Sequence, residues 1–299
     1  MPQSRQSTTI PFAVAAFGIA TFSTMDALMR GATIAIGAYN AVFWRTLIMV
    51  PLAGVIYLLS RDPWPSWPSM RFHALRGVLS AGLAVSFFWG LARMPMAEAI
   101  ALSFIAPIIA LYLAALLLGE RVSRQAIGAS MLGFAGVLVI AWAQLGSGAG
   151  DRDPWATAAV LVSAALYAWN IVLMRQQAQV AGAFEVPFFQ GIVAAACLAL
   201  FAPRFADLPP AGLLTTLAGA ALLAAVALML FAWAYRRAEA QLLATVEYTA
   251  LIWAMLFDTL LFDKPIELTT VGGGMLIVSG CLIAVRPSRV PLSPAEAPL

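Results

Sequence analysis

Charged side chains are scarce in this sequence, and so are the residues that most often carry out chemistry. Only 10% of the 299 residues are Asp, Glu, Lys or Arg, whereas soluble globular domains have roughly 25%. The chain has one histidine and two cysteines. What it has instead is apolar residues, with 62% hydrophobic side chains and a mean hydropathy of +0.90. This balance excludes an ordinary soluble domain.

The few reactive residues form no catalytic or nucleotide-binding motif. Cys197 and Cys281 lie in apolar runs without a CxxC spacing, which is typical of buried, unpaired thiols. The sequence lacks Gly-x-x-x-x-Gly-Lys-Ser/Thr, His-Glu-x-x-His and Gly-x-Ser-x-Gly segments. His73 lies beside Arg71 at an expected helix start, so we expect it at the membrane interface. We predict no enzyme activity, no metal site, no cofactor and no nucleic acid partner.

Apolar runs of about the ~20 residues that span a bilayer recur along nearly the whole chain. Five lie in the first half and five in the second, separated by a polar Gly/Ser/Asp stretch. The expected spans are residues 10–29, 38–59, 75–92, 97–118, 126–143, 155–174, 184–202, 212–235, 242–262 and 268–285. We therefore predict an all-α integral membrane protein with ten transmembrane helices.

The positions of the basic residues predict the orientation. Lys and Arg in short loops are retained on the cytoplasmic side. With the amino terminus inside, most of the 17 Lys and Arg residues fall on that side, including Arg76 at the expected start of the third span. We predict a multi-pass protein of the inner (cytoplasmic) membrane with both termini in the cytoplasm.

The two halves of the chain are similar to each other. A shift of 144 residues aligns Trp89 with Trp233 and Arg93 with Arg237, and glycines and alanines match at the same offset. Each half has an odd number of expected spans, so the two copies enter the membrane in opposite directions, as in the inverted repeats of many secondary transporters. The pattern predicts a central site between the halves.

Three segments show a resemblance to a known family. They are Phe43-Trp44-Arg45-Thr46, Pro95-Met96-Ala97-Glu98 leading into Pro107, and Leu118-Gly119-Glu120-Arg121. With these, the sequence resembles the drug/metabolite transporter superfamily, specifically proteins with two EamA-type domains. The second copy diverges, because Gln190 replaces the arginine of the first copy and Leu251 stands where Pro107 does. The resemblance implies a ten-helix bundle, alternating access and small organic solutes.

The expected organisation has four parts. Residues 1–145 form a first EamA-like five-helix repeat, and residues 146–154 form a linker. Residues 155–287 form the second repeat, and residues 288–299 form a disordered cytoplasmic tail.

Ionisable residues inside the expected spans are the first candidates for a site. Inserting such a group at the centre of a transmembrane helix costs about 2.5–3.5 kcal/mol. It is therefore expected to have a charged or polar partner, to face a water-filled cavity, or to have a role in function. Arg45 and Asp26 either form a static ion pair or line a solute site, where an arginine suits a carboxylate or phosphate. Glu247 has no cation in its own span; it holds a proton or a cationic group, or it extends to Arg236 or Arg237 at the inner surface.

Further candidates are aromatic and amide side chains in the same spans. Trp89, Trp233 and Tyr248 are expected either to line a cavity or to form interfacial belts. Asn170 and Gln190 are polar groups inside the bundle, and Ser103 lies opposite Glu247 in the repeat register. Pro107 is expected to kink the fourth span, as a gating hinge or as a static bend. The aromatic, amide and serine side chains are the second group of predicted substrate-binding residues, and Pro107 is the predicted gating hinge.

The sequence therefore predicts a secondary transporter of amino-acid-like, zwitterionic or amphiphilic metabolites, driven by a proton or solute counter-gradient. Its partners are the small-molecule substrate and the lipid bilayer. The alternatives are a gated channel and a non-transporting membrane scaffold. The sequence leaves the substrate, the direction of transport and the oligomeric state open.

Overall fold

The described part of the chain is helical. The structure, a computed structural model, describes residues 9–93, 96–103, 105–119, 124–145, 153–239, 243–262 and 268–285. Its elements are α1 (Thr9–Ile36), α2 (Ala38–Ser60), α3 (Trp67–Leu91), α4 (Met96–Ser103), α5 (Ile105–Leu118), α6 (Arg124–Leu145), α7 (Pro154–Val180), α8 (Glu185–Ala199), α9 (Ala202–Phe205), α10 (Ala211–Tyr235), the 3₁₀ helix η1 (Ala244–Tyr248), α12 (Thr249–Phe262) and α13 (Leu268–Val285). Most of the expected linker and the whole expected tail lie outside the described residues.

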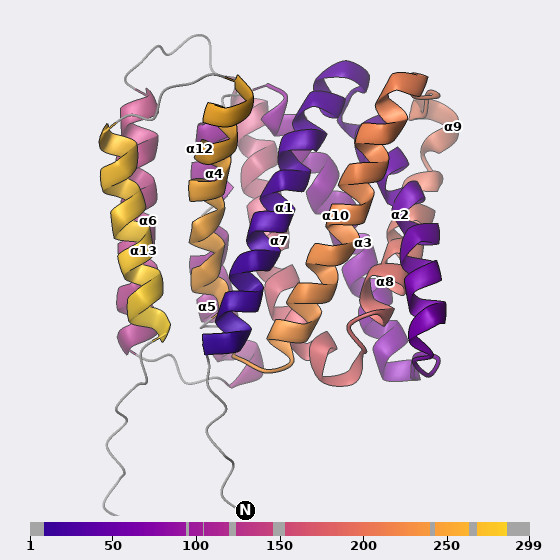
Figure 1. Cartoon of the computed structure of the whole chain (residues 1–299), viewed down its shortest axis with the longest axis horizontal. Helices are drawn as coiled ribbons and strands as arrows, with labels where there is room; N and C mark the ends of the chain where they lie inside the picture. Colours follow the sequence, from indigo (N-terminus) through magenta and orange to yellow (C-terminus); the bar gives the residue numbers. More distant parts are fainter. Residues whose placement is uncertain are drawn as a thin grey trace, which may run out of the picture.

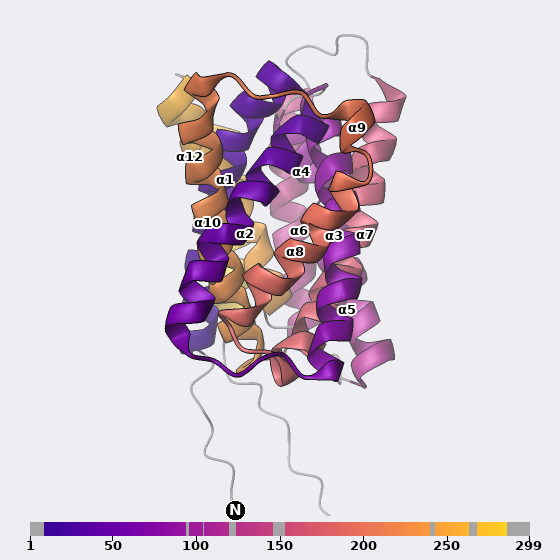
Figure 2. The same ribbon diagram turned by 90° about the vertical axis from the view of Figure 1, so that its right-hand side faces the viewer.

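Apolar composition explains why these segments form helices. Backbone N–H and C=O groups find no water in hydrocarbon, and a helix pairs them within one segment. Five of the described helices, α1, α2, α3, α7 and α10, are long and apolar enough to cross a membrane, with mean hydropathies between 1.5 and 2.3. The helices lie side by side as one bundle (Figures 1 and 2).

The third span begins earlier than the sequence analysis placed it. The Ser66 side chain precedes α3 and accepts a hydrogen bond from the Ser69 N–H at 3.4 Å. Pro68 lies in the first turn, where no intrahelical partner is needed for its nitrogen. The longer helix carries His73 and Arg76, whose exposed fractions are 0% and 2%. Both side chains are therefore buried against neighbouring helices rather than exposed on the surface of the protein.

Glycines let α3 pack directly on its neighbours. A Cβ added to Gly77 would lie 2.6 Å from the Cβ of Val193 on α8. A Cβ added to Gly90 would lie 2.5 Å from Cγ2 of Val160 on α7. Small residues at such crossings allow helix axes to come close in membrane proteins. The polar side chains of α3 are thereby brought within hydrogen-bond distance of α7 and α8.

The two halves have matching elements and share one interior. The bounds of α3 and α10 differ by 144 residues at both ends, as do those of α5 and α12. The most extensive packing joins helices of different halves, since α1 lies along α10 and α6 along α13 (Figure 1), and α3 lies along α7 (Figure 2). The space inside the bundle is consequently lined by both halves.

Candidate functional site

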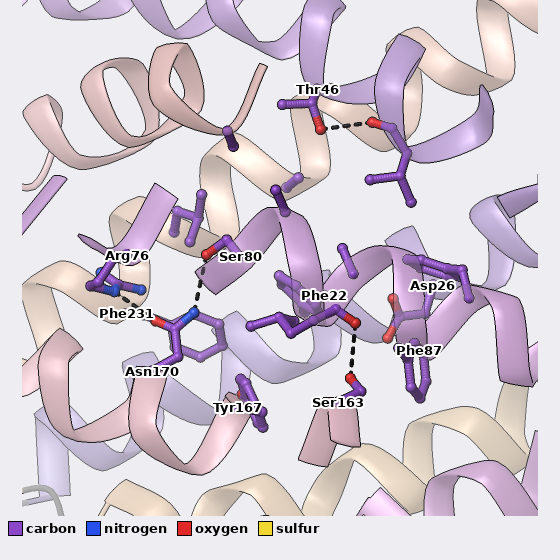
Figure 3. Close-up of a pocket in the computed structure, with 18 of the residues that line it drawn as sticks. Phe22, Asp26, Thr46, Arg76, Ser80, Phe87, Ser163, Tyr167, Asn170 and Phe231 are labelled. Carbon is purple, nitrogen blue, oxygen red and sulfur yellow. Dashed lines mark hydrogen bonds between the residues drawn. The ribbon is translucent and has the colours of Figure 1, made fainter. Parts of the chain in front are cut away.

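A cavity of about 220 Å³ lies inside the bundle. Its walls come from α1, α2, α3 and α4 of the first half and from α7, α8, α10, η1 and α12 of the second. The sequence-predicted residues that line it are Asp26, Arg45, Ser103, Asn170, Gln190 and Glu247. Polar residues that the sequence analysis did not select also line it: Arg76, Ser80, Ser163 and Tyr167. Figure 3 shows part of this wall.

Arg76 reaches the cavity from α3 and is held by amide side chains of α7. Its Nε donates to Asn170 Oδ1 at 2.7 Å, and its Nη1 donates to Gln177 Oε1. Ser80 Oγ accepts hydrogen bonds from Asn170 Nδ2 at 3.0 Å and from Gln190 Nε2 at 2.9 Å. Gln190 Oε1 is buried without a partner, and Arg76 Nη2 has none within the described part of the chain. This side of the cavity therefore offers both a donor and an acceptor to a ligand.

Asp26 and Arg45 face the same cavity and do not form the static ion pair that was one of the two alternatives from the sequence. In the described residues, no Arg45 nitrogen lies within 4.0 Å of an Asp26 carboxylate oxygen. Arg45 Nη1 instead donates to the sulfur of Met25 at 3.2 Å, and Arg45 Nε is buried without a partner. Buried polar atoms in native proteins are usually paired. The arginine is therefore available to a ligand rather than committed to Asp26.

Glu247 has a hydroxyl partner. It is 6% exposed, and its Oε2 accepts a hydrogen bond from the Tyr167 hydroxyl at 2.8 Å. Pairing with Arg236 or Arg237, the alternative raised by the sequence, does not occur: both arginines are exposed, and Arg237 Nη1 donates to the Trp233 carbonyl oxygen at 3.0 Å. The carboxylate is directed at the cavity instead.

The three predicted aromatic residues lie outside this cavity. Trp89, Trp233 and Tyr248 are not among the residues that line the cavity. The guanidinium groups of Arg93 and Arg237 lie 3.8 and 3.9 Å from the ring centres of Trp89 and Trp233. Each arginine follows its tryptophan by four residues at the end of α3 or α10, so the two copies repeat one helix-end arrangement. Tyr248 is buried inside the protein.

The remaining wall is apolar and includes aromatic rings. Phe22, Phe87 and Phe231 line the cavity, and the ring centres of Phe22 and Phe231 are 6.2 Å apart. Pro107 belongs to the first turn of α5, and its side chain lies outside the described part, so the gating hinge stays a prediction. The cavity thus combines separated charges with a phenylalanine-rich surface.

Comparison with known proteins gives full-length matches. The model of the EamA-like transporter family matches twice, over residues 10–142 and 154–286. The pseudopaline exporter CntI of Pseudomonas aeruginosa is 28% identical over 279 residues, covering 90% of this chain and 93% of the relative. The aromatic amino acid exporter YddG of Ancylobacter novellus is 26% identical over 243 residues, covering 79% and 81%.

A solved crystal structure has the same fold. It superposes with a TM-score of 0.75 at 20% sequence identity, over 92% of this chain and 96% of that one. The similarity extends along nearly the whole of both chains, and at this identity it concerns the fold alone.

Proposed function

Because this chain belongs to the EamA-like transporter family, we propose that it is a secondary carrier that exports small zwitterionic solutes of amino acid size by alternating access. The chain is a membrane transporter of small metabolites, and the solute class and the mechanism are our proposal. The observation that carries the proposal is the cavity, whose wall holds the cation Arg76 on one side and the anion Asp26 on the other. Relatives named as exporters support the outward direction.

The separation of charge suits a molecule with a carboxylate and an ammonium group. Figure 3 shows Arg76 with Asn170 and Ser80 on one side of the cavity, and Asp26 on the other. A guanidinium binds a carboxylate through two parallel N–H donors, and a carboxylate binds an ammonium group. Charges inside a membrane protein need partners. A zwitterion placed between Arg76 and Asp26 would supply a partner to each.

The dimensions favour a small solute. A cavity of about 220 Å³ lies below the roughly 300–1,000 Å³ that is typical of pockets for drug-sized ligands. The phenylalanines on its wall favour a solute with an apolar or aromatic side chain, since aromatic rings pack edge to face with one another. An aromatic amino acid meets both conditions.

The proposed architecture has ten membrane spans in two inverted five-helix repeats, residues 1–145 and 155–287, with both termini in the cytoplasm. It is supported by the equal offsets of the repeated helices and by the pairing of α1 with α10 and of α3 with α7. It is also supported by the opposite directions in which α1 and α7 run through the bundle (Figure 1). The distribution of arginines supports the location of the termini.

A carrier is favoured over a gated channel by the form of the cavity. Conducting pores need weak sites that ions leave quickly. Here the charged groups Arg45, Asp26 and Glu247 face a cavity between the two halves, which is where carriers built from repeats bind solutes. A counter-gradient of protons or of a second solute would drive net export.

Counterflow in proteoliposomes tests this function. Liposomes containing the purified protein are loaded with unlabelled L-phenylalanine, and entry of tritiated L-phenylalanine is followed. We expect saturable exchange that L-tryptophan inhibits strongly, while phenylpyruvate and phenethylamine, which each lack one of the two charges, inhibit weakly. Arg76→Gln and Asp26→Asn should raise the half-saturating concentration by roughly 10–100-fold, because each removes one charged contact.

The matched control is Arg93→Gln, which removes an exposed arginine at the far end of α3 and should leave exchange unchanged. Flux that rises linearly with concentration would point to the channel. If no amino acid exchanges faster than in empty liposomes, the zwitterion proposal fails.

A further inference from the structure

A second buried polar cluster lies outside the cavity, where α3 and α8 begin. His73 Nε2 is 2.7 Å from Glu185 Oε1, and the imidazole has no exposed surface. Ser69 also donates to Oε1, and the Gly182 N–H donates to Oε2 at 3.1 Å. Hydrogen bonds donated to both oxygens favour the ionised form of a carboxylate. His73 is therefore a neutral donor to a buried anion, or a cation beside it.

Gln177 connects this cluster to the cavity. Its Nε2 lies 2.9 Å from His73 Nδ1, and its Oε1 accepts from Arg76 Nη1. Arg76 in turn donates to Asn170 on the cavity wall. One continuous chain of hydrogen bonds thus runs from Glu185 through His73, Gln177 and Arg76 to the proposed solute site.

The chemistry of the chain assigns the protons. An arginine only donates, so Gln177 must direct its oxygen at Arg76 and its amide N–H at His73. His73 Nδ1 is then an acceptor, and the single imidazole proton lies on Nε2 and is donated to Glu185. In this arrangement the positive charge of Arg76 balances the negative charge of Glu185.

A second proton on the imidazole cannot fit this arrangement. The new N–H at Nδ1 would face the N–H of Gln177, so the amide must turn its oxygen to His73. Its NH₂ group would then face Arg76, which loses one of its two amide partners. The chain would also carry one uncompensated positive charge, which is costly inside a membrane protein. A carboxylate bound at Arg76 removes both difficulties.

The remaining charged and titratable groups near His73 lie beyond these contacts. On the Glu185 side they are Tyr57 of α2 and Asp62 of the following loop. On the cavity side they are Asp26 of α1, Arg45 of α2, Tyr167 of α7, Tyr235 of α10 and Glu247 of η1. Arg71 on α3 itself is exposed, and the Glu98 side chain of α4 lies outside the described residues. Glu185 is the one charged group in direct contact with the imidazole within the described part.

We propose that His73 is a proton-binding site that controls Arg76: when the imidazole takes up a proton, Gln177 releases the guanidinium, which then binds the carboxylate of the solute. This inference rests on the proposed function, because it assigns a role to the same solute site. By thermodynamic linkage, a bound proton on His73 must raise the affinity for the carboxylate by the same factor by which the bound carboxylate raises the affinity of His73 for the proton. His73 and Gln177 are thus positioning residues for Arg76.

The single histidine of the chain makes the test direct. The full-length protein, purified without a histidine tag and labelled with nitrogen-15 histidine, gives the imidazole signals of one residue. These signals are followed by NMR between about pH 5 and 8. We expect saturating L-phenylalanine to move the His73 titration to higher pH and phenethylamine, which lacks the carboxylate, to leave it in place. L-Phenylalanine should bind ~10-fold more tightly at the acid end.

Two variants separate this role from a merely structural one. His73→Gln keeps a donor toward Glu185 and an acceptor toward Gln177 but cannot titrate, so the tighter binding of L-phenylalanine at the acid end should be lost. In Gln177→Leu the imidazole should still titrate, but L-phenylalanine should no longer move its titration.

The outcomes distinguish the two proposals. If L-phenylalanine binds and the His73 titration does not move, the relay is refuted and the proposed function stands. If no amino acid binds, the proposed solute class fails. The coupling between His73 and Arg76 is then tested by following the His73 titration in the Arg76→Gln variant without ligand. Loss of that cation must move the His73 titration to higher pH, and an unchanged titration overturns the inference.

Discussion

Replacing Gly77 by alanine tests how closely α3 packs on α8. The added Cβ would lie 2.6 Å from Val193 Cβ and 2.9 Å from the Gln190 carbonyl oxygen, whereas ordinary contacts begin near 3.4 Å. The helices must therefore separate locally by about 0.8 Å, because a backbone oxygen cannot rotate away. No rotamer change relieves this clash.

The separation acts on two hydrogen bonds between these helices. The His73–Glu185 contact is 2.7 Å and the Gln190–Ser80 contact is 2.9 Å, and lengthening by that amount takes both beyond the usual range. Overpacking costs about 1–3 kcal/mol, and each lost hydrogen bond costs about 0.5–1.5 kcal/mol. We expect Gly77→Ala to reduce the free energy of unfolding by about 2–6 kcal/mol.

Thermal unfolding in detergent, followed by the fluorescence of the nine tryptophans, measures the change. The matched control is Gly82→Ala on the same helix, where the nearest atom to an added Cβ is Leu166 Cδ1 at 3.8 Å. We expect Gly77→Ala to unfold several degrees lower than wild type and Gly82→Ala to unfold at an unchanged or slightly higher temperature. Equal stability of the two variants would refute the close packing of α3 on α8.

Two further substitutions separate the cavity from the helix ends. Tyr167→Phe leaves Glu247 Oε2 without its hydroxyl donor, so the half-saturating concentration of L-phenylalanine in counterflow should change several-fold, by about 1–2 kcal/mol; an unchanged value would remove Glu247 from the site. Trp233→Ala removes a ring that stacks on Arg237 outside the cavity. Counterflow should be preserved, and a large loss would place Trp233 in the solute path.

The sequence predicts the helical class, the repeat and part of the site. Apolar runs specify helices whatever they pack against, because every backbone hydrogen bond is satisfied inside the segment. Asp26, Arg45 and Glu247 were found because an ionisable group in an apolar run is conspicuous by itself. Asn170 and Gln190 were found because a polar amide in an apolar run needs a hydrogen-bond partner inside the bundle.

Arg76 was missed because its position depends on where α3 begins. The apolar run alone starts at residue 75, which assigns Arg76 to the surface. The Ser66-Trp67-Pro68 segment, a capping serine followed by proline in the first turn, is the local signal that would have extended the helix. With that extension, the sequence predicts an arginine inside the bundle.

Other features of the site were decided by tertiary packing alone. Arg76 and His73 find partners 94, 101 and 112 residues away in the chain, and no periodicity within one helix specifies which helix it will face. Trp89 and Trp233 are the opposite case. The internal repeat in the sequence made them candidates for the site, but they lie at helix ends outside the cavity. The sequence by itself determined which segments are helices, because that depends on local hydrogen bonds and solvent. The tertiary structure decided which polar groups meet, because that depends on how closely small residues such as Gly77 let the helices approach.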